Sequence, residues 1–277
     1  MEIRQITSAD RREILAFTEK TFEWGDYISD VFDDWLKEGL FLAAEMDGEV
    51  VGIMHASYLD DGSAWFEGGR IHPEHRRQGI ATALAVAALD RITQDKIRTG
   101  VEEQNIASGN LLKKAGAIPV MDYSIYEVPC MDGESGAKKA GMDDVKTLID
   151  DAKRHDQSWL YSPWKSWQRF AEKALIGVID RVYQTKNGLA VVNDLGDRLS
   201  LAPQFFDSDA LWDFLLMASH VARESGGKVV ELHIPIESSD LIEGKGFLHI
   251  TDLMIYEIDR GYIQNLSHLA KLKGSGP

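Results

Sequence analysis

The sequence predicts an α/β (α+β) fold with two domains, each built on a mixed, mostly antiparallel central sheet that is flanked by helices. Three observations lead to this prediction. The chain has 277 residues, a length typical of about two domains. Short apolar segments separated by turn signals such as Asp47-Gly48 predict hairpins between longer helical segments. A stretch near the middle of the chain is repeated near its end, which indicates a duplicated domain.

The first half of the chain begins with a short strand and two helices. Thr7-Ser8-Ala9-Asp10 has the composition of a helix start, and the apolar spacing after it is helical. Three strands joined by tight turns follow, and the Ala/Leu-rich segment behind them has strong helix propensity. In chain order the predicted elements are strand 3–6, helix 11–22, helix 27–38, strands 41–46, 50–56 and 64–71, helix 79–92, strand 98–103, helix 108–115 and strand 121–129.

The second half keeps the rhythm of the first. Residues 105–128 and 235–258 align at an offset of 130 residues without a gap, and eight of the 24 aligned positions are identical. Helices are predicted at 142–155 and 209–224, and strands at 188–193, 199–206 and 228–234. The predicted division is a domain at 1–130, a small, polar, Gly-rich linker at 131–141, a second domain at 142–260 and a tail at 261–277. An unrelated α/β domain is the alternative for the second half.

Composition excludes several classes of function. The formal net charge of -15 argues against general nucleic-acid binding, which needs a basic surface, and it is compatible with a small cationic substrate. No apolar run is long enough to span a bilayer, and the N-terminus has no signal-peptide core. The single cysteine, Cys130, cannot form an internal disulfide, so a cytoplasmic protein is expected. No metal site is predicted, and the oligomeric state is left open.

The segment from Gly69 to Thr82, GRIHPEHRRQGIAT, is the most informative motif of the chain. It predicts a strand end, a tight turn and a helix start. The turn places Arg76, Arg77 and Gly79 beside the free backbone N–H groups that open the helix, and such a place binds phosphate groups. An ordinary strand-to-helix turn with surface arginines is the alternative.

The run Arg76-Arg77-Gln78-Gly79-Ile80-Ala81 resembles the acyl-coenzyme A loop of the GNAT N-acetyltransferase superfamily, whose pattern is Arg/Gln-x-x-Gly-x-Gly/Ala. The order of elements over residues 1–129 also resembles the GNAT fold. This resemblance implies two GNAT-like domains and an enzyme that moves an acetyl group from acetyl-CoA to a primary amine by direct attack on the thioester. The residues that it implies for the diphosphate of coenzyme A are Arg76, Arg77, Gln78, Gly79, Ile80, Ala81 and Thr82.

The resemblance also implies roles for the strand before the loop. Gly69, Arg70 and Ile71 would form a splayed strand edge that pairs with the pantetheine arm, and the Ile71 N–H would point at the thioester oxygen. Gly68-Gly69 suits a bulge in this strand. Glu67 stands where many GNAT enzymes carry a carboxylate that takes the amine proton through water. A solvated carboxylate or a structural partner of Arg70 is the alternative for Glu67.

Asn105 begins a segment that resembles the family pattern Asn-x-x-Ala/Ser-x-x-Leu-Tyr-x-Lys-x-Gly-Phe, which implies that Asn105 and Ser108 contact the cofactor. The family tyrosine that protonates the leaving thiolate is replaced here by Leu112. Transfer would then be slower, or the proton would come from another group, with Tyr123 and Tyr126 as candidates.

The second half has no counterpart of the loop. Residues 201–208 contain neither an arginine pair nor a glycine, so this half is predicted to be a degenerate copy without its own cofactor. An aromatic segment at 159–167 could close over the first site or pack the domains together. Packing is the preferred interpretation, because tryptophan side chains are usually buried.

The acceptor of this family usually enters beside the two early helices. Residues 22–35 mix aromatic side chains with five acids, which suits a cationic amine. An amphipathic helix with solvated acids is the alternative. The acids are Glu23, Asp26, Asp30, Asp33 and Asp34.

Two other functions compete with the acetyltransferase. Leu112 favours a catalytically weak or inactive acyl-CoA-binding sensor or scaffold, while Glu67 and the intact loop favour the enzyme. A protein-interaction module without a cofactor would leave the loop idle. The sequence does not name the amine acceptor.

Overall fold

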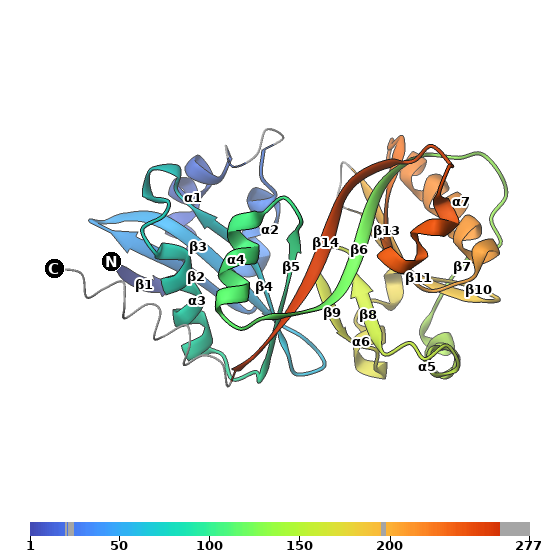
Figure 1. Cartoon of the computed structure of the whole chain (residues 1–277), viewed down its shortest axis with the longest axis horizontal. Helices are drawn as coiled ribbons and strands as arrows, with labels where there is room; N and C mark the ends of the chain where they lie inside the picture. Colours follow the sequence, from blue (N-terminus) through green and yellow to red (C-terminus); the bar gives the residue numbers. More distant parts are fainter. Residues whose placement is uncertain (20, 22–24, 195–197, 261–277) are drawn as a thin grey trace.

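The computed structural model shows two halves that lie side by side and are joined by one continuous twisted sheet (Figure 1). The structure describes residues 1–19, 21, 25–194 and 198–260. Within these ranges the strand order is β1-β2-β3-β4-β5-β14-β6-β13-β12-β11-β10-β7, and β8 and β9 form a separate hairpin. Most neighbouring strands are antiparallel, β4 and β5 are parallel, and so are β12 and β13. This mixed sheet flanked by helices confirms the predicted fold class.

The first half follows the predicted order of elements closely. Its hairpin at Asp47-Gly48 joins β2 and β3 as predicted. The predicted first helix ends earlier than expected, and residues 20 and 22–24 lie outside the described part of the chain. The elements are β1 (Glu2–Gln5), α1 (Arg11–Thr18), α2 (Ile28–Trp35), β2 (Leu40–Met46), β3 (Glu49–Tyr58), β4 (Ala64–Ile71), α3 (Ile80–Arg91), β5 (Lys96–Glu102), α4 (Ile106–Lys114) and β6 (Ile118–Pro129), with short 3-10 helices at Ser8–Asp10 and Pro73–His75.

The second half repeats this path with two differences, an added hairpin and a 3-10 helix in place of the last α-helix. A two-residue strand, β7, lies inside the predicted linker and pairs with β10. The aromatic segment forms the hairpin β8–β9, which was not predicted. A 3-10 helix, η5, replaces the last α-helix. The elements are β7 (Lys138–Lys139), η3 (Met142–Asp144), α5 (Val145–Arg154), β8 (Trp159–Ser162), β9 (Ser166–Arg169), α6 (Glu172–Ile176), η4 (Ile179–Arg181), β10 (Val182–Thr185), β11 (Gly188–Asp194), β12 (Leu199–Phe205), α7 (Ser208–Glu224), β13 (Val229–Pro235), η5 (Ile236–Ile242) and β14 (Leu248–Asp259). The expected tail, 261–277, lies outside the described residues.

The two halves exchange their last strands. β14, at the end of the chain, pairs with β5 of the first half, and β6 pairs with β13 of the second half. β6 and β14 also pair with each other, with Tyr123 opposite Leu253 and Ser124 opposite Asp252. Because Tyr123 and Leu253 are equivalent positions of the repeat, this ladder has an approximate twofold axis between them. Dividing the sequence near residue 130 therefore gives two parts whose strands belong to one continuous sheet.

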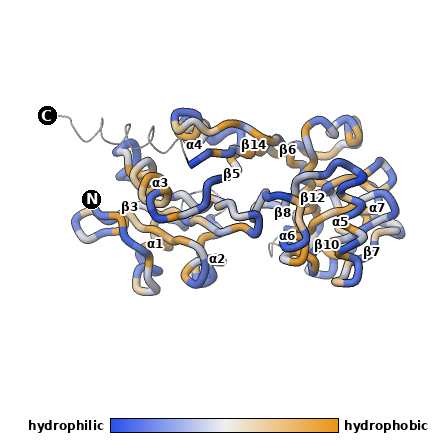
Figure 2. The backbone as a smooth tube through the Cα atoms, turned by 90° about the horizontal axis from the view of Figure 1, so that it is seen from below, coloured by the Kyte–Doolittle hydropathy of each residue, from blue (hydrophilic) through white to orange (hydrophobic). Residues whose placement is uncertain are grey.

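Within the described part of the chain, five apolar clusters hold the sheet and helices together. Figure 2 shows that hydrophobic segments lie mainly in strands and packed helices of both halves. The central cluster joins the halves: Trp65 of β4, Tyr123 of β6 and Leu253 of β14 pack with Tyr161 and Trp167 of the hairpin. The hairpin therefore packs the halves together, which confirms the preferred interpretation of the aromatic segment. None of the described helices has the length and apolar character needed to cross a membrane.

Candidate active site

Strands β4 and β5 separate after a short parallel ladder. Only Ala64–Ile97 and Trp65–Arg98 are paired between them. Beyond that point β4 continues along β3 to Ile71, while β5 continues along β14 to Glu102. Among the described residues, the edge of β4 that faces β5 therefore has no strand partner after Trp65, and its backbone groups face this gap.

The end of β4 turns one backbone N–H toward this gap. The His72 N–H donates to the carbonyl of Val51 on β3 at 2.9 Å. Successive N–H groups of a strand point to opposite sides, so the Ile71 N–H points away from β3 and toward the gap. This is the orientation that an oxyanion donor at Ile71 requires, and Gly69 lies two residues earlier on the same edge.

A β-bulge precedes this edge, as predicted. The pairing of β3 with β4 shifts between Ile53 and His55, and Gly68 has a φ of +63°. A Cβ atom on Gly68 would collide with the Trp35 ring. Glycine is therefore required here both by the backbone angle and by the close approach of Trp35.

The loop after β4 leaves the start of α3 uncapped. Gly79 is the N-cap residue with a φ of +83°, no side chain of the described residues caps the helix, and a Cβ on Gly79 would meet nothing within 4 Å. The first N–H groups of α3 therefore face open space, and the helix dipole adds positive potential. The side chains of Arg76 and Arg77 are exposed. Ile80 is buried in the core, so only its backbone faces the loop.

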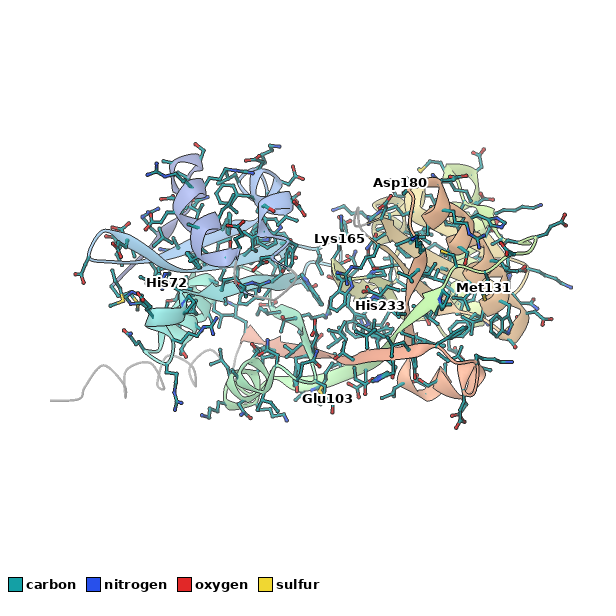
Figure 3. The ribbon with its side chains drawn as sticks, turned by 90° about the horizontal axis from the view of Figure 1, so that it is seen from above. His72, Glu103, Met131, Lys165, Asp180 and His233 are labelled. Atoms are coloured by element: carbon teal, nitrogen blue, oxygen red, sulfur yellow. The ribbon has the colours of Figure 1, made fainter. Side chains whose placement is uncertain are left out.

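The predicted cofactor residues from Arg76 to Thr82 thus form one turn beside the open end of β4. Figure 3 places His72 at this turn on the first half, and His233 inside the second half. The loop and the free strand edge are adjacent because β4 runs into the loop without interruption.

Glu67 lies on β4 just before the bulge and is half-buried. Its Oε1 accepts a hydrogen bond from Ser57 Oγ at 2.7 Å and lies 3.0 Å from His55 Nδ1. The alternative of a structural pair with Arg70 is wrong, because Arg70 binds Asp26 instead. Sequence reasoning missed His55. The signal was a lone histidine inside the apolar run Val50 to Ala56, on the strand that pairs with β4.

Arg70 points toward the start of α2. Its Nε lies 2.7 Å from Asp26 Oδ2 and its Nη2 lies 3.1 Å from Asp26 Oδ1, and its guanidinium lies over the Tyr27 ring. The Asp26 side chain is 1% exposed, so this is a nearly buried, bidentate ion pair. The side chain of Arg70 therefore faces the predicted acceptor region, and its backbone belongs to the strand edge.

Most other acids of the predicted acceptor region face solvent. Asp33 pairs with Arg11, Asp34 pairs with Lys37, and all four side chains are exposed. Asp30 accepts a hydrogen bond from the neighbouring Ser29. Glu23 lies outside the described residues. For Asp33 and Asp34 the structure thus favours the alternative of solvated helix acids.

Glu102, at the end of β5, is a second acid that sequence reasoning missed. Burial raises the pKa of its carboxyl group, the Glu231 carboxylate raises it further, and Arg198 and Arg70 lower it. Charged groups of both halves therefore influence the Glu102 carboxyl group.

The predicted cofactor residues of α4 lie beyond the end of β5. Asn105 is the N-cap of α4, and its Oδ1 accepts a hydrogen bond from the Ser108 N–H at 3.2 Å. Leu112 of α4 packs against the core cluster that includes Leu84 and Ala88 of α3. The side-chain oxygen Oδ1 of Asn105 therefore caps the helix, while its side-chain nitrogen Nδ2 has no hydrogen bond within the described part of the chain.

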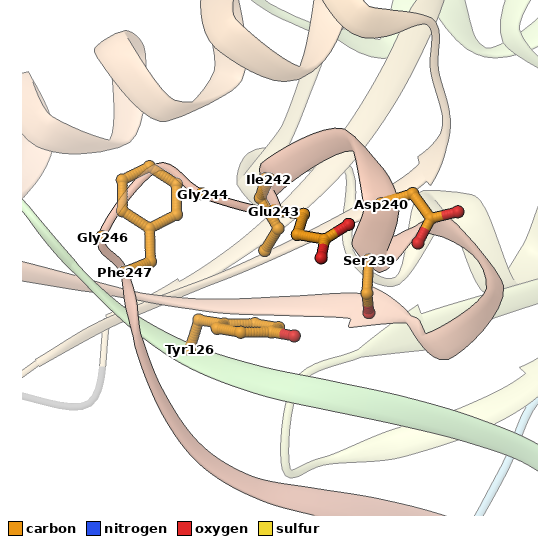
Figure 4. A pocket seen from close by; sticks show the side chains of 8 residues that line it. All are labelled: Tyr126, Ser239, Asp240, Ile242, Glu243, Gly244, Gly246 and Phe247. Carbon is orange, nitrogen blue, oxygen red and sulfur yellow. The ribbon is translucent and has the colours of Figure 1, made fainter.

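Neither candidate tyrosine lies free beside the gap. Tyr123 is stacked on Tyr161 with 4.3 Å between ring centroids, and burial raises the pKa of its hydroxyl. Tyr126 lines a separate cavity of about 390 Å³ in the second half, together with residues of η5 and the loop after it (Figure 4). Both side chains therefore serve the second half and the junction.

The corresponding gap of the second half is filled. β12 and β13 separate after three paired positions, Leu199 to Leu201. Tyr161 of β8 exchanges hydrogen bonds with the Gln204 side chain on β12, at 2.8 and 2.9 Å. Its hydroxyl lies 2.9 Å from His233 Nδ1 on β13. The hairpin therefore bridges the two strands where the first half has an open edge.

The helix after β12 is also capped. Asp207 is the N-cap of α7, and its Oδ1 accepts a hydrogen bond from the Ala210 N–H at 2.8 Å. This bond, with a second from Asn187, holds the pKa of Asp207 below its ordinary value. A carboxylate thus occupies at α7 the place that is open behind Gly79 at α3.

Comparisons with known proteins agree with this geometry. Residues 8–117 match the model of the Acetyltransferase (GNAT) family. A candidate acetyltransferase from Thermoplasma acidophilum is similar over 94% of this chain and 100% of its own, with 17% identity and a TM-score of 0.66. A GCN5-related N-acetyltransferase from Sphaerobacter thermophilus is similar over 94% and 95%, with 15% identity and a TM-score of 0.65. A tandem GNAT protein from the clavulanic acid biosynthesis pathway is similar over 94% and 98%, with 13% identity and a TM-score of 0.60. Residues 8–117 therefore carry the sequence pattern of the GNAT acetyltransferase family, and the whole chain shares its fold with solved proteins named for that family.

Proposed function

We propose that this protein is an N-acetyltransferase that moves an acetyl group from acetyl-CoA to a primary amine at the first-half site. One observation carries the proposal: the free edge of β4 leads, through the short loop of residues 72–78, to a helix start that Gly79 leaves uncapped. An extended pantetheine arm ending in a diphosphate has the complementary shape and charge. We also propose that the enzyme is cytoplasmic, since a single cysteine suits a reducing compartment.

The residues that would hold coenzyme A fall into two groups. Backbone N–H groups from Arg77 to Thr82 would bind the diphosphate, with Arg76, Arg77 and Gln78 at its rim. The backbone of Gly69, Arg70 and Ile71 would pair with the pantetheine arm. Asn105 and Ser108 would contact the cofactor from the β5 side.

The thioester supplies an activated acyl carbon. The Ile71 N–H would donate a hydrogen bond to the carbonyl oxygen as negative charge develops on it. Glu67 would accept, directly or through water, the proton that the amine loses, because an alkyl ammonium with a pKa of about 10.4 is not nucleophilic until deprotonated. An ordinary thiol has a pKa of about 8.5, so coenzyme A can leave as the thiolate even though Leu112 cannot donate a proton to it.

We propose that the second half is a degenerate GNAT-like copy without a cofactor. Two features support this: the β8 hairpin fills the gap between β12 and β13, and Asp207 places negative charge at the start of α7. A diphosphate would be repelled there. The second half would instead form one wall of the acceptor site, near Glu102.

We propose a cationic amine as the acceptor, because the carboxylates of Glu67 and Glu102 border the gap. Asp26, on the first-half side of the gap, is paired with Arg70, so its carboxylate is not available to the acceptor amine. A polyamine, an amino-sugar or a peptide amine has this chemistry.

The test uses the full chain with acetyl-CoA and a panel of primary amines, and follows free thiol and acetylated product. We expect release that depends on both the amine and the protein, and heat of binding for coenzyme A alone. Binding without turnover would favour a sensor or scaffold. Absence of both binding and turnover would reject the proposed site.

A further inference from the structure

His55 has partners on both ring nitrogens and no contact with solvent. Its side chain is 0% exposed. Nε2 lies 3.1 Å from the carbonyl oxygen of Glu38, and Nδ1 lies 3.0 Å from Oε1 of Glu67. The ring is stacked on Trp35, with 4.3 Å between centroids and 7° between planes, and Phe41 packs against it edge-on. The ring is therefore held in one orientation.

The partners determine where the protons lie. The Glu38 carbonyl can only accept, so Nε2 of His55 carries a hydrogen. If the ring held no second proton, the lone pair of Nδ1 would face the lone pairs of the Glu67 carboxylate at hydrogen-bond distance. A proton therefore lies between Nδ1 and Oε1. The Ser57 hydroxyl also donates to Oε1 at 2.7 Å, which favours the carboxylate form of Glu67 and a proton on Nδ1.

This arrangement uses one carboxylate oxygen and spares the other. Oε1 of Glu67 receives both hydrogen bonds, whereas Oε2 has none from the described residues. Glu67 is partly exposed and stands immediately before the Gly68 bulge, four residues before Ile71. Its spare oxygen is thus the one available to an amine or a bridging water in the gap.

We propose that His55 is a positioning residue for Glu67: it donates from Nδ1 to Oε1, fixes the carboxylate beside the gap, and leaves Oε2 to take the proton of the acceptor amine. This inference rests on the proposed acetyl transfer. No covalent bond to His55 is formed. One proton of the ammonium moves to Oε2, the N–C bond forms, the C–S bond breaks, the second nitrogen proton leaves with the thiolate as the thiol, and the resident proton stays on Nδ1.

Two substitutions separate the two ring nitrogens. The amide nitrogen of asparagine can take the place of Nδ1, so His55→Asn keeps a donor for Glu67 and loses the bond to Glu38. The amide nitrogen of glutamine can take the place of Nε2, so His55→Gln keeps the bond to Glu38 and loses the donor for Glu67. Both remove the ring, so both disturb the contact with Trp35.

We expect His55→Gln to lower kcat by about 10- to 100-fold with little change in the KM for acetyl-CoA. This is less than the roughly 100- to 10,000-fold that a general base itself contributes, because Glu67 is still present. His55→Asn should lose clearly less, on the order of 3-fold. Ile14→Val is the control, because Ile14 is buried in the same core cluster as Trp35 and is not among the partners of His55 given above, so its kcat per folded molecule should stay close to that of the unmodified protein. Equal losses for His55→Gln and His55→Asn would overturn the positioning role.

A spectroscopic measurement separates this inference from the proposed function. In protein labelled with ¹⁵N-histidine, His55 should show a hydrogen on both ring nitrogens, and Glu67→Gln should remove the one on Nδ1. If the wild-type protein transfers no acetyl group, the proposed function is rejected. The ¹⁵N resonances of His55 would still show whether His55 and Glu67 share a proton. A bare Nδ1 in the wild-type protein would overturn the inference.

Discussion

The gap beside β4 and the gap beside β12 are made by the same order of strands, but only the second is filled. In both halves a parallel ladder ends after two or three positions and the strands separate. In the second half Tyr161 of the β8 hairpin joins β12 to β13, and Asp207 caps the helix behind. In the first half Gly79 leaves the helix start open. The sheet alone therefore does not determine whether the gap is open. The segments packed around it, the β8 hairpin and the residue at the helix start, determine this.

The two parallel ladders also carry buried charges of opposite sign, in each case at the second paired position. Arg98 is opposite Trp65 in the first ladder, and Glu231 is opposite Ser200 in the second. Arg98 binds Asp61 at 2.7 Å and Glu257 at 2.8 Å. Both charges also hold the hairpin: Arg98 donates to the Trp167 carbonyl, and Glu231 accepts from the Trp164 ring nitrogen. The hairpin is thus anchored from both halves.

The largest expected effect comes from the first anchor. Arg98→Met removes the buried cation that pairs with Asp61 and Glu257, since Arg98 is only 3% exposed. Asp61 then keeps its hydrogen bonds from Ser63 and the Arg169 N–H, and Glu257 keeps Lys96, but neither carboxylate keeps its buried counter-charge. Breaking such a buried pair costs about 3–5 kcal/mol of unfolding free energy. Urea unfolding measures this loss. The control is Lys37→Met at the exposed pair with Asp34, which should cost at most about 1 kcal/mol. Equal costs would show that Arg98 is not an anchor.

The next prediction makes the first helix start resemble the second. Gly79→Asp places a carboxylate at the N-cap of α3, where Asp207 stands at α7. Like-charge repulsion of a diphosphate costs several kcal/mol, so coenzyme A affinity should fall by on the order of 100-fold in calorimetry. The reverse change, Asp207→Gly, should leave binding at the first site unchanged and create none in the second half, since Tyr161 still fills that gap. Undiminished affinity in Gly79→Asp would contradict the proposed diphosphate site.

The second anchor gives a pH-dependent prediction. Burial pushes the pKa of Glu231 up, but hydrogen bonds from His233, Trp164 and Ser200 outweigh it and hold the pKa well below the ordinary 4.5. A depressed folded-state pKa stabilises the fold above pH 4.5, and this stabilisation is lost as the pH falls below that value. Glu231→Gln should therefore lower the unfolding free energy by about 2 kcal/mol at pH 7. The difference from wild type should shrink between about pH 4.5 and pH 3. A difference that is constant over this range would refute the charge-based anchor.

The smallest effect concerns the bulge that shapes the open gap. Gly68→Ala should cost about 1–2 kcal/mol more than Gly62→Ala, because both positions have positive φ but only an alanine at 68 would meet the Trp35 ring. Thermal unfolding of the two variants gives the difference. Gly68→Ala should also weaken acetyl transfer, because the bulge sets the course of the strand edge at Ile71. Equal stability of the two variants would mean that Trp35 moves aside freely.

Much of the first site could be predicted from local patterns. The strand end, the turn and the helix start around Gly79 are set by neighbouring residues, so the loop was placed correctly. The bulge at Gly68 was predicted for the same reason, since a pair of glycines in a strand marks such a distortion. The partner of Glu67 was not predicted, because His55 lies twelve residues away on another strand and only the register of β3 with β4 brings the two together.

The sequence by itself determined the order of helices and strands in the first half, the turn at Gly79 and the repeat that links the two halves, because these depend on propensities and spacing over short distances. Only the tertiary structure decided the exchange of β6 and β14, the filling of the second gap by β8 and the pairing of Arg70 with Asp26. Each of these joins residues far apart in the chain, where many partners compete. Packing of the whole core, rather than local preference, selects among them.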